Sequence, residues 1–188
     1  MAWWRPRRLV QPIELESLDA YARWAAAYSP EVHNPLMALE EQAMLGLDNS
    51  PAMLARAAAL GQPLARADLL NLPLAAGGWD VVVCGLAVGH VAALASVLGE
   101  MGRVLAPGGS VVYSDLHPFG ALAGWKRSFR GQDGREYAAR HHIHLYADHQ
   151  AACQAAGLTI TAVREPRIEF DHPYRGYPAV LVIRASKP

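Results

Sequence analysis

The sequence lacks the composition biases that mark several protein classes. Its 188 residues include 17 basic and 17 acidic side chains, so there is no excess positive charge of the kind that general nucleic-acid binding needs. No apolar run approaches the roughly 20 residues of a transmembrane helix. The basic residues 3–8 are not followed by the apolar stretch of a signal peptide. We therefore expect neither a nucleic-acid nor a membrane partner.

Cysteine is scarce as well. Only Cys84 and Cys153 occur, far apart and without C-x-x-C spacing, so no disulfide framework is indicated. Cys84 lies inside an apolar run, where a buried thiol is the simplest interpretation. A reduced, cytoplasmic setting follows as the expectation.

Helical spacing of apolar residues marks the first third of the chain and predicts helices over residues 17–29 and 36–45. The best-marked helix covers residues 51–60. Ser50 is a good N-cap for it, a proline occupies its first turn, and Gly61 ends it.

From Trp79 onward the pattern becomes that of an α/β protein. The segment 80–84 is almost wholly apolar, as in a parallel strand that is covered on both faces. Apolar residues then recur at helical spacing as far as Leu105, and residues 110–114 indicate the next strand. Strand, helix and strand of these lengths predict a βαβ crossover. A helix over 147–156 and strands over 158–164 and 179–185 complete the expected order.

Several segments, taken in order, resemble class I S-adenosylmethionine (SAM) dependent methyltransferases of the type 11 kind. They are GLDNSPAML (46–54) at the end of the second strand of that family, DLLNLPL (68–74) after its third, WDVVVCGLAVG (79–89) at its fourth, and RVLAPGG (103–109) at the turn into its fifth. YARW (21–24) and HNPLM (33–37) resemble the N-terminal cap helices of members that act on small molecules.

One part of the family pattern is missing. Members carry an earlier strand that ends in a glycine-rich E/D-x-G-x-G-x-G turn, and the methionine end of the cofactor lies over this turn. No such turn occurs in the 188 residues, and the gap falls between Leu45 and Asp48. A strand, turn, helix and return strand amount to about 30 residues. Strand one lies between strands two and four of the family's sheet, so its loss would move one wall of the site by about 4.8 Å, one strand spacing.

The resemblance implies a single α/β domain over residues 1–188. The expected fold is a truncated, Rossmann-like methyltransferase fold, with a mostly parallel sheet, helices on both faces and a C-terminal antiparallel hairpin. Its expected parts are cap helices (1–45), a remnant of the cofactor-binding core (46–117), an irregular substrate-side insertion (118–146), and a C-terminal helix and hairpin (147–188).

The resemblance also assigns cofactor-binding roles. Asp48 aligns with the acid that accepts hydrogen bonds from the ribose hydroxyls, which suits a carboxylate because it only accepts. Asp68 aligns with the acid that receives the adenine amino group, and Leu69 with the backbone N–H beside the ring. Gly85 and Leu86 leave strand four, where small residues let the backbone approach a ligand. Each of these positions also fits an ordinary turn or cap residue, and both interpretations stay open.

Two histidines follow the carboxyl ends of predicted parallel strands, where open α/β sheets bind ligands. We expect His90 near the reactive end of the cofactor and His117 facing the acceptor, both as catalytic residues.

The histidine-rich segment 140–149 fits a polar wall of the acceptor site, in which one histidine acts as general base toward a hydroxyl or amine. It fits structural histidines equally well. On a strand, His142 and His144 would face one way and His141 the other. Because no second ligand cluster is evident, we expect no metal site. The basic residues of segment 125–142 favour either an anionic acceptor or a solvated charged face.

Methyl transfer needs little acid–base chemistry, so positioning carries much of the acceleration. Three interpretations follow for a chain without the glycine-rich turn. In the first, the chain binds SAM in a smaller pocket and methylates a small molecule. In the second, it is a non-catalytic relative that binds a partner or ligand. In the third, it is a shortened copy of a methyltransferase without activity. We expect a SAM-dependent family member for a small-molecule acceptor, with activity lowered or lost.

Overall fold

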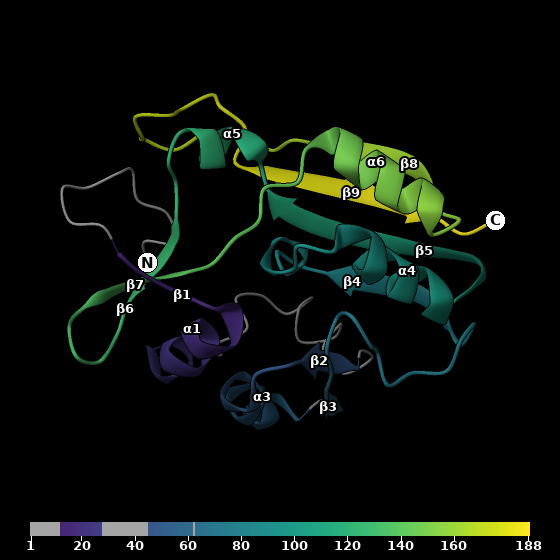
Figure 1. Cartoon of the computed structure of the whole chain (residues 1–188), viewed down its shortest axis with the longest axis horizontal. Helices are drawn as coiled ribbons and strands as arrows, with labels where there is room; N and C mark the ends of the chain where they lie inside the picture. Colours follow the sequence, from purple (N-terminus) through teal and green to yellow (C-terminus); the bar gives the residue numbers. More distant parts are fainter. Residues whose placement is uncertain (1–11, 28–44, 62) are drawn as a thin grey trace. The chain divides into compact units, whose positions relative to one another are not determined.

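The computed structural model describes residues 12–27, 45–61 and 63–188 (Figure 1). The chain divides into two compact units. Unit 1 comprises Met1–Asp68 and Arg127–Arg140, and unit 2 comprises Leu69–Lys126 and His141–Pro188. The expected single domain and its four parts stay predictions, and the helix expected over 36–45 falls outside the described residues.

Unit 2 is built on a four-stranded sheet in the order β4-β5-β9-β8. β4 (Trp79–Cys84) runs parallel to β5 (Leu105–Leu116) and is joined to it through α4 (Leu94–Val104), which confirms the predicted βαβ crossover. β9 (Val180–Ser186) lies antiparallel between β5 and β8 (Thr159–Arg164), which confirms the C-terminal hairpin. The fold is thus the expected α/β, Rossmann-like one.

α4 and α6 (Tyr146–Ala155) lie side by side over one face of this sheet (Figure 1). On the two central strands, β5 and β9, alternate residues point into the layer between sheet and helices and are at most 2% exposed, among them Val111, Tyr113, Leu181 and Ile183. On β4, Val81 and Val83 point to the opposite face of the sheet and are 57% and 56% exposed. Among the described strands β4 pairs only with β5, so this sheet ends at an apolar edge strand.

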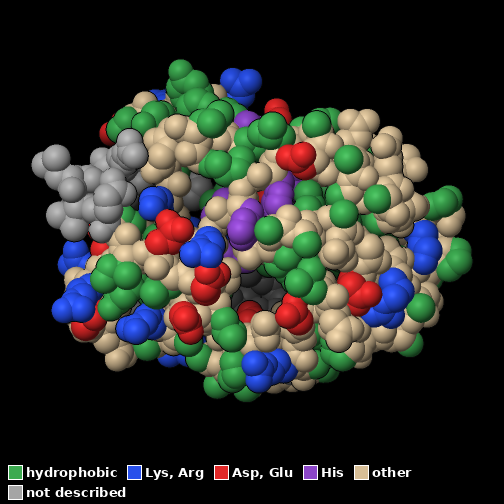
Figure 2. All heavy atoms as spheres, viewed as in Figure 1, with side chains coloured by type: hydrophobic (Ala, Val, Ile, Leu, Met, Phe, Trp, Pro, Cys, Tyr) green, Lys and Arg blue, Asp and Glu red, His purple; other side chains and the backbone are tan. Residues whose placement is uncertain are grey.

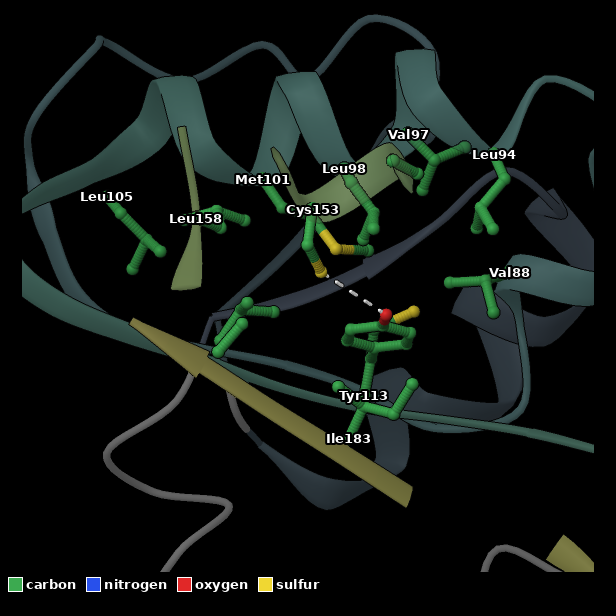
Figure 3. Close-up of a cluster of buried hydrophobic side chains, with 14 of the residues drawn as sticks. Val88, Leu94, Val97, Leu98, Met101, Leu105, Tyr113, Cys153, Leu158 and Ile183 are labelled. Atoms are coloured by element: carbon green, nitrogen blue, oxygen red, sulfur yellow. Dashed lines mark hydrogen bonds between the residues drawn. The ribbon is translucent and has the colours of Figure 1, made fainter. Parts of the chain in front are cut away.

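The core of unit 2 fills the space between sheet and helices (Figure 3). Leu94, Leu98 and Met101 of α4, whose spacing predicted this helix, are at most 5% exposed. The helical spacing continued as far as Leu105, but α4 ends at Val104, and residues 105–109 belong to β5. β5 takes in these residues because a bulge shifts its register against β4, with Gly108 at a φ of 78°.

Unit 1 contains a parallel pair of short strands, β2 (Gly46–Asp48) and β3 (Leu64–Arg66). α3 (Pro51–Ala57) connects them and continues as a 3₁₀ turn over Ala58–Leu60. Both predicted ends of this helix are confirmed. The side chain of Ser50 accepts the N–H of Met53, and Gly61 has a φ of 74°.

A second sheet of unit 1 has the order β1-β7-β6, formed by β1 (Ile13–Leu15), β6 (Arg127–Arg130) and β7 (Glu136–Ala139). α1 (Ser17–Trp24), followed by a 3₁₀ turn over Ala25–Ala27, packs on it through a small core of Ala20, Trp24, Phe129 and Tyr137. Of the aromatic residues that share the helical spacing of segment 17–29, Trp24 packs partly buried against this core, and Tyr28 lies outside the described residues.

The expectation of an irregular segment over 118–146 was wrong. It contains α5 (Pro118–Leu122) and the β6–β7 hairpin. Strands of four residues are too short for their alternation to stand out in the sequence. None of the described helices is both long and apolar enough to cross a membrane.

Candidate functional site

Asp48 and Asp68 lie at the carboxyl ends of neighbouring parallel strands in unit 1. Asp48 ends β2, its backbone oxygen accepts the N–H of Ala67 at 3.0 Å, and Asp68 directly follows Ala67. The carboxylate of Asp48 accepts the N–H of Ser50 at 2.7 Å, as a turn residue before a helix does. Burial raises the pKa of Asp48, and hydrogen bonds from Ser50 and Asn49 offset part of the rise. Carboxylate oxygens accept more than one bond, so this turn role leaves room for a diol.

Gly85 and Leu86 leave the carboxyl end of β4 in unit 2. Leu86 has a φ of 54°, in the left-handed region that costs a non-glycine residue about 1–2 kcal/mol. Its N–H is held between the backbone oxygen of Ser114, at 3.1 Å, and the Oγ of Ser114, at 3.0 Å. Backbone strain of this kind clusters at ligand sites. Leu69 packs partly buried against the core of the same unit.

The two predicted catalytic histidines have different surroundings. His90 ends a 3₁₀ turn, η3 (Val88–His90), just beyond β4, and its ring lies edge-on to that of His141 with centroids 6.1 Å apart. His117 follows β5 and caps α5, since its Nδ1 accepts the N–H of Phe119 at 3.2 Å. The Nε2 of His117 lies 3.3 Å from Glu165. A catalytic role for His117 requires its ring to leave these contacts.

Asp115 is a site residue that the sequence reasoning missed. It lies near the carboxyl end of β5 and is 2% exposed. Its Oδ1 lies 3.4 Å from the Nε2 of His141, and its Oδ2 lies 4.0 Å from the Nε2 of His149. The alternation of side chains along a strand could have indicated this position. Asp115 is two residues beyond Tyr113 and four beyond Val111, so it faces the same buried layer.

His149 of α6 is fully buried. Its Nδ1 lies 3.3 Å from the hydroxyl of Tyr113, which also lies 3.6 Å from the sulfur of Cys153 (Figure 3). The Nε2 of His149 has no hydrogen-bond partner among the described residues. Burial raises the pKa of Tyr113, with the Cys153 contact adding to the rise, and burial also raises the pKa of Cys153.

The burial of His149 predicts an acid-sensitive fold. Burial, with a smaller contribution from His144, lowers the pKa of His149 from 6.5 to about 4. As the pH falls, His149 therefore becomes protonated in the unfolded chain at a higher pH than in the folded one. The free energy of unfolding falls as the pH drops from 6.5 to about 4. The lowering corresponds to about 3 kcal/mol. Urea unfolding between pH 4 and 7.5 measures it, and His149→Gln is expected to flatten the dependence. An unchanged slope in that variant contradicts the assignment.

The segment 141–145 is not a strand, so the expected alternation of its histidines was wrong. The N–H of His142 donates to the backbone oxygen of Gly89 at 2.7 Å. The Nε2 of His144 lies 2.9 Å from the backbone oxygen of Val91. Histidine side chains gather on one part of the face shown in Figure 2. Over the described ranges, no group of three or more His, Cys, Asp or Glu is arranged to hold a metal ion.

Two arginines of the basic segment have local partners in unit 1. Arg140 lies 3.7 Å from Glu14 and also pairs with Glu16. The guanidinium of Arg127 lies over the ring of Tyr21, 5.8 Å from its centroid. These contacts favour a structural role over an anion site.

Comparison with known proteins bears on the family. Residues 31–113 match the family model described as a methyltransferase domain. The chain is 34% identical over 80 residues to phthiotriol/phenolphthiotriol dimycocerosates methyltransferase 1 of Mycobacterium ulcerans (strain Agy99). This match covers 43% of the chain and only 30% of the length of that relative.

Solved structures extend the likeness. A SAM-dependent methyltransferase from Mesorhizobium loti is 26% identical, with a TM-score of 0.60 over 76% of this chain and 80% of that one. A structure from Listeria monocytogenes, assigned to the same class, has a TM-score of 0.62 at 18% identity, over 92% and 100% of the two chains, and shows the fold alone. Taken with the strand order, the crossover and the matching segments, these findings show that the chain is similar to SAM-dependent methyltransferases in its fold and in part of its sequence.

Proposed function

We propose that this protein is a SAM-dependent methyltransferase that acts on a small molecule. It binds the cofactor weakly, through contacts with the adenosine part alone. The observation that carries the proposal is the position of Asp48 and Asp68 at the carboxyl ends of adjacent parallel strands. In such sheets ligands bind beyond these ends. Asp48 is proposed for the ribose hydroxyls and Asp68 for the adenine amino group, with Leu69 beside the ring.

In unit 2, Gly85 and Leu86 at the exit of β4 are the further residues that the resemblance assigns to the cofactor. Leu86 is held in a strained conformation by Ser114, and beside it Gly85 presents bare backbone. A cofactor bound there supplies an electrophilic methyl group, and the residues of the chain supply position. His90 and His117 are proposed on the acceptor side.

The sequence contains no segment that corresponds to the family's binding site for the methionine end of the cofactor. Glycine-rich turns offer backbone N–H groups at a helix N-terminus to the charged end of a ligand, and no such turn occurs here. Binding is therefore expected to be weak, and transfer slow, because misplacement by about 1 Å costs roughly 100-fold in rate.

The acceptor and the setting are also proposals. The name of the M. ulcerans relative gives it a phthiotriol-type acceptor, which supports a small organic molecule for this chain rather than a nucleic acid. The thiols of Cys84 and Cys153 are free and buried, which fits the proposed cytoplasmic setting.

A non-catalytic binding or interaction protein is the alternative. It is favoured by the missing turn and by the exposed apolar edge at Val81 and Val83, which a partner would cover. This alternative predicts a folded protein that is indifferent to SAM and co-purifies with another molecule.

Thermal unfolding in SAM tests the proposal. A ligand at ten times its Kd adds about 1.4 kcal/mol, which raises the Tm of a chain of this size by roughly 3–5 °C. Asp48→Asn is expected to remove the shift, whereas Asp171→Asn, at an exposed loop position, keeps it. A folded protein whose Tm does not respond to millimolar SAM contradicts the proposal and favours the alternative.

A further inference from the structure

We propose that Glu100 and Arg103 of α4 are positioning residues for the adenine end of the cofactor, because they fix the segment that carries Leu69. This inference rests on the proposed function, in which the backbone N–H of Leu69 lies beside the adenine ring. The two charged side chains act through the backbone of the segment and do not themselves touch the cofactor. All three residues belong to unit 2.

The segment that follows Leu69 depends on outside contacts for its conformation. Residues 69–78 belong to none of the described helices and strands, so their backbone groups need partners elsewhere. Leu69 packs partly buried against the core, whereas Leu70 beside it is 44% exposed. One packed side chain leaves much of the backbone freedom of a loop in place. The position of the Leu69 N–H therefore depends on what holds the residues after it.

Glu100 and Arg103 hold this backbone at Leu72 and Leu74. The Oε2 of Glu100 accepts the N–H of Leu72 at 2.7 Å. The guanidinium of Arg103 donates to the backbone oxygen of Leu72 at 2.9 Å and to that of Leu74 at 2.8 Å. The side chain of Leu72 is buried as well. Both backbone polar groups of Leu72 are thus bound by side chains from one turn of α4.

The two charged side chains also bind each other. The Nε of Arg103 lies 2.7 Å from the Oε1 of Glu100, and its Nη2 lies 2.8 Å from the Oε2, which makes a bidentate pair. The hydrogen bond from Arg103 lowers the pKa of Glu100. A partly exposed pair of this kind contributes little to stability by itself. Its hydrogen bonds to the loop backbone point instead to a role in fixing the loop.

The far end of the segment is held without these side chains. Gly77 donates its N–H to the backbone oxygen of Arg103, and Gly78 donates to that of Val104, each at 3.0 Å. The last carbonyl oxygens of a helix have no partner within it, so these bonds satisfy them. Loss of either charged side chain leaves these contacts and the core of unit 2 in place. Variants at the two positions are therefore expected to fold.

Amide hydrogen exchange, followed by nuclear magnetic resonance, tests the contact without any cofactor. Glu100→Ala and Arg103→Gln are expected to speed exchange at Leu72 about tenfold or more, because the loop opens locally more often. Exchange at Gly77, whose N–H donates to a backbone oxygen, is the internal reference and is expected to stay unchanged. Arg164→Gln, at an exposed position of β8, is the matched control. Unchanged exchange at Leu72 in the folded variants overturns the inference.

Titration calorimetry with 5′-methylthioadenosine, at a temperature where every variant is folded, tests whether the contact serves binding. Arg103→Gln is expected to raise the Kd about tenfold, as when the segment adopts the binding conformation one tenth of the time. Arg103→Lys keeps the charge but lacks the planar fork, so it is expected to raise the Kd as well. A purely structural role would lower the Tm and leave the Kd unchanged.

The outcomes separate this inference from the proposed function. If the unaltered chain binds 5′-methylthioadenosine and either arginine variant binds it equally well, this inference alone is overturned. If the unaltered chain binds neither SAM nor 5′-methylthioadenosine, the proposed function fails and this inference fails with it.

Discussion

A strand, glycine-rich turn and helix inserted between Leu45 and Gly46 are expected to raise the affinity for SAM about 100-fold or more. The added turn offers backbone N–H groups to the charged methionine end, and two such bonds contribute about 1.5–3 kcal/mol each. Each 1.4 kcal/mol is about tenfold in Kd. The affinity for 5′-methylthioadenosine, which lacks the amino-acid end, is expected to change little. Titration calorimetry of both ligands measures the two effects separately.

The control insert keeps the length and the strand but replaces the turn glycines by valine. It restores the bulk of the sheet without allowing close backbone approach, because valine rarely adopts the conformations open to glycine. This variant is expected to fold but not to gain SAM affinity. Equal affinities in the two inserts contradict the account of the missing turn.

Replacing Gly89 by alanine is expected to destabilise unit 2 by about 3 kcal/mol, at the upper end of the usual cost of overpacking. The added Cβ overlaps both His141 and Asp115, and Asp115 is fixed on a buried strand position. Unfolding in urea, followed by circular dichroism, measures the loss. Gly99→Ala in α4 is the matched control, because a Cβ there meets nothing within 4 Å. That change is expected to stabilise the helix by roughly 0.5–1 kcal/mol.

A double variant separates the contact with His141 from a general packing effect. His141→Ala removes the ring that the new Cβ would meet, so the cost of Gly89→Ala is expected to shrink in the double variant. Additive costs would show that His141 is not seated on Gly89.

Local signals predicted the parts of the fold whose stabilising contacts are close in sequence. The helix from Pro51 was readable because its cap, its first-turn proline and its closing Gly61 lie within a few residues of one another. The crossover between β4 and β5 was readable from the change of apolar spacing. Both features depend on contacts that a single sequence window contains.

The site was less readable, because its geometry depends on contacts across long stretches of sequence. Leu86 adopts a left-handed conformation in which its N–H donates to Ser114, and a leucine gives no local sign of this. Asp115 becomes a buried carboxylate through His141 and His149, which follow it by more than 20 residues. The sequence indicated a histidine-rich wall without showing which histidine meets an acid.

The shortened cofactor core stays a prediction from the sequence, which lacks the glycine-rich turn. In the described residues, β2 and β3 form one parallel pair, and β4 begins a separate sheet with an exposed apolar edge. The family's first strand belongs between strands two and four. We therefore expect the adenosine half of the site to persist while the methionine half is lost.

Calorimetry on the unaltered chain tests this claim most directly, with SAM and 5′-methylthioadenosine compared under the same conditions. We expect both ligands to bind, with Kd values within about threefold of each other, a difference below ~0.7 kcal/mol. SAM binding more than about tenfold tighter, by over 1.4 kcal/mol, would show that the chain still holds the methionine end and would contradict the account. Absence of binding by both ligands would contradict it as well.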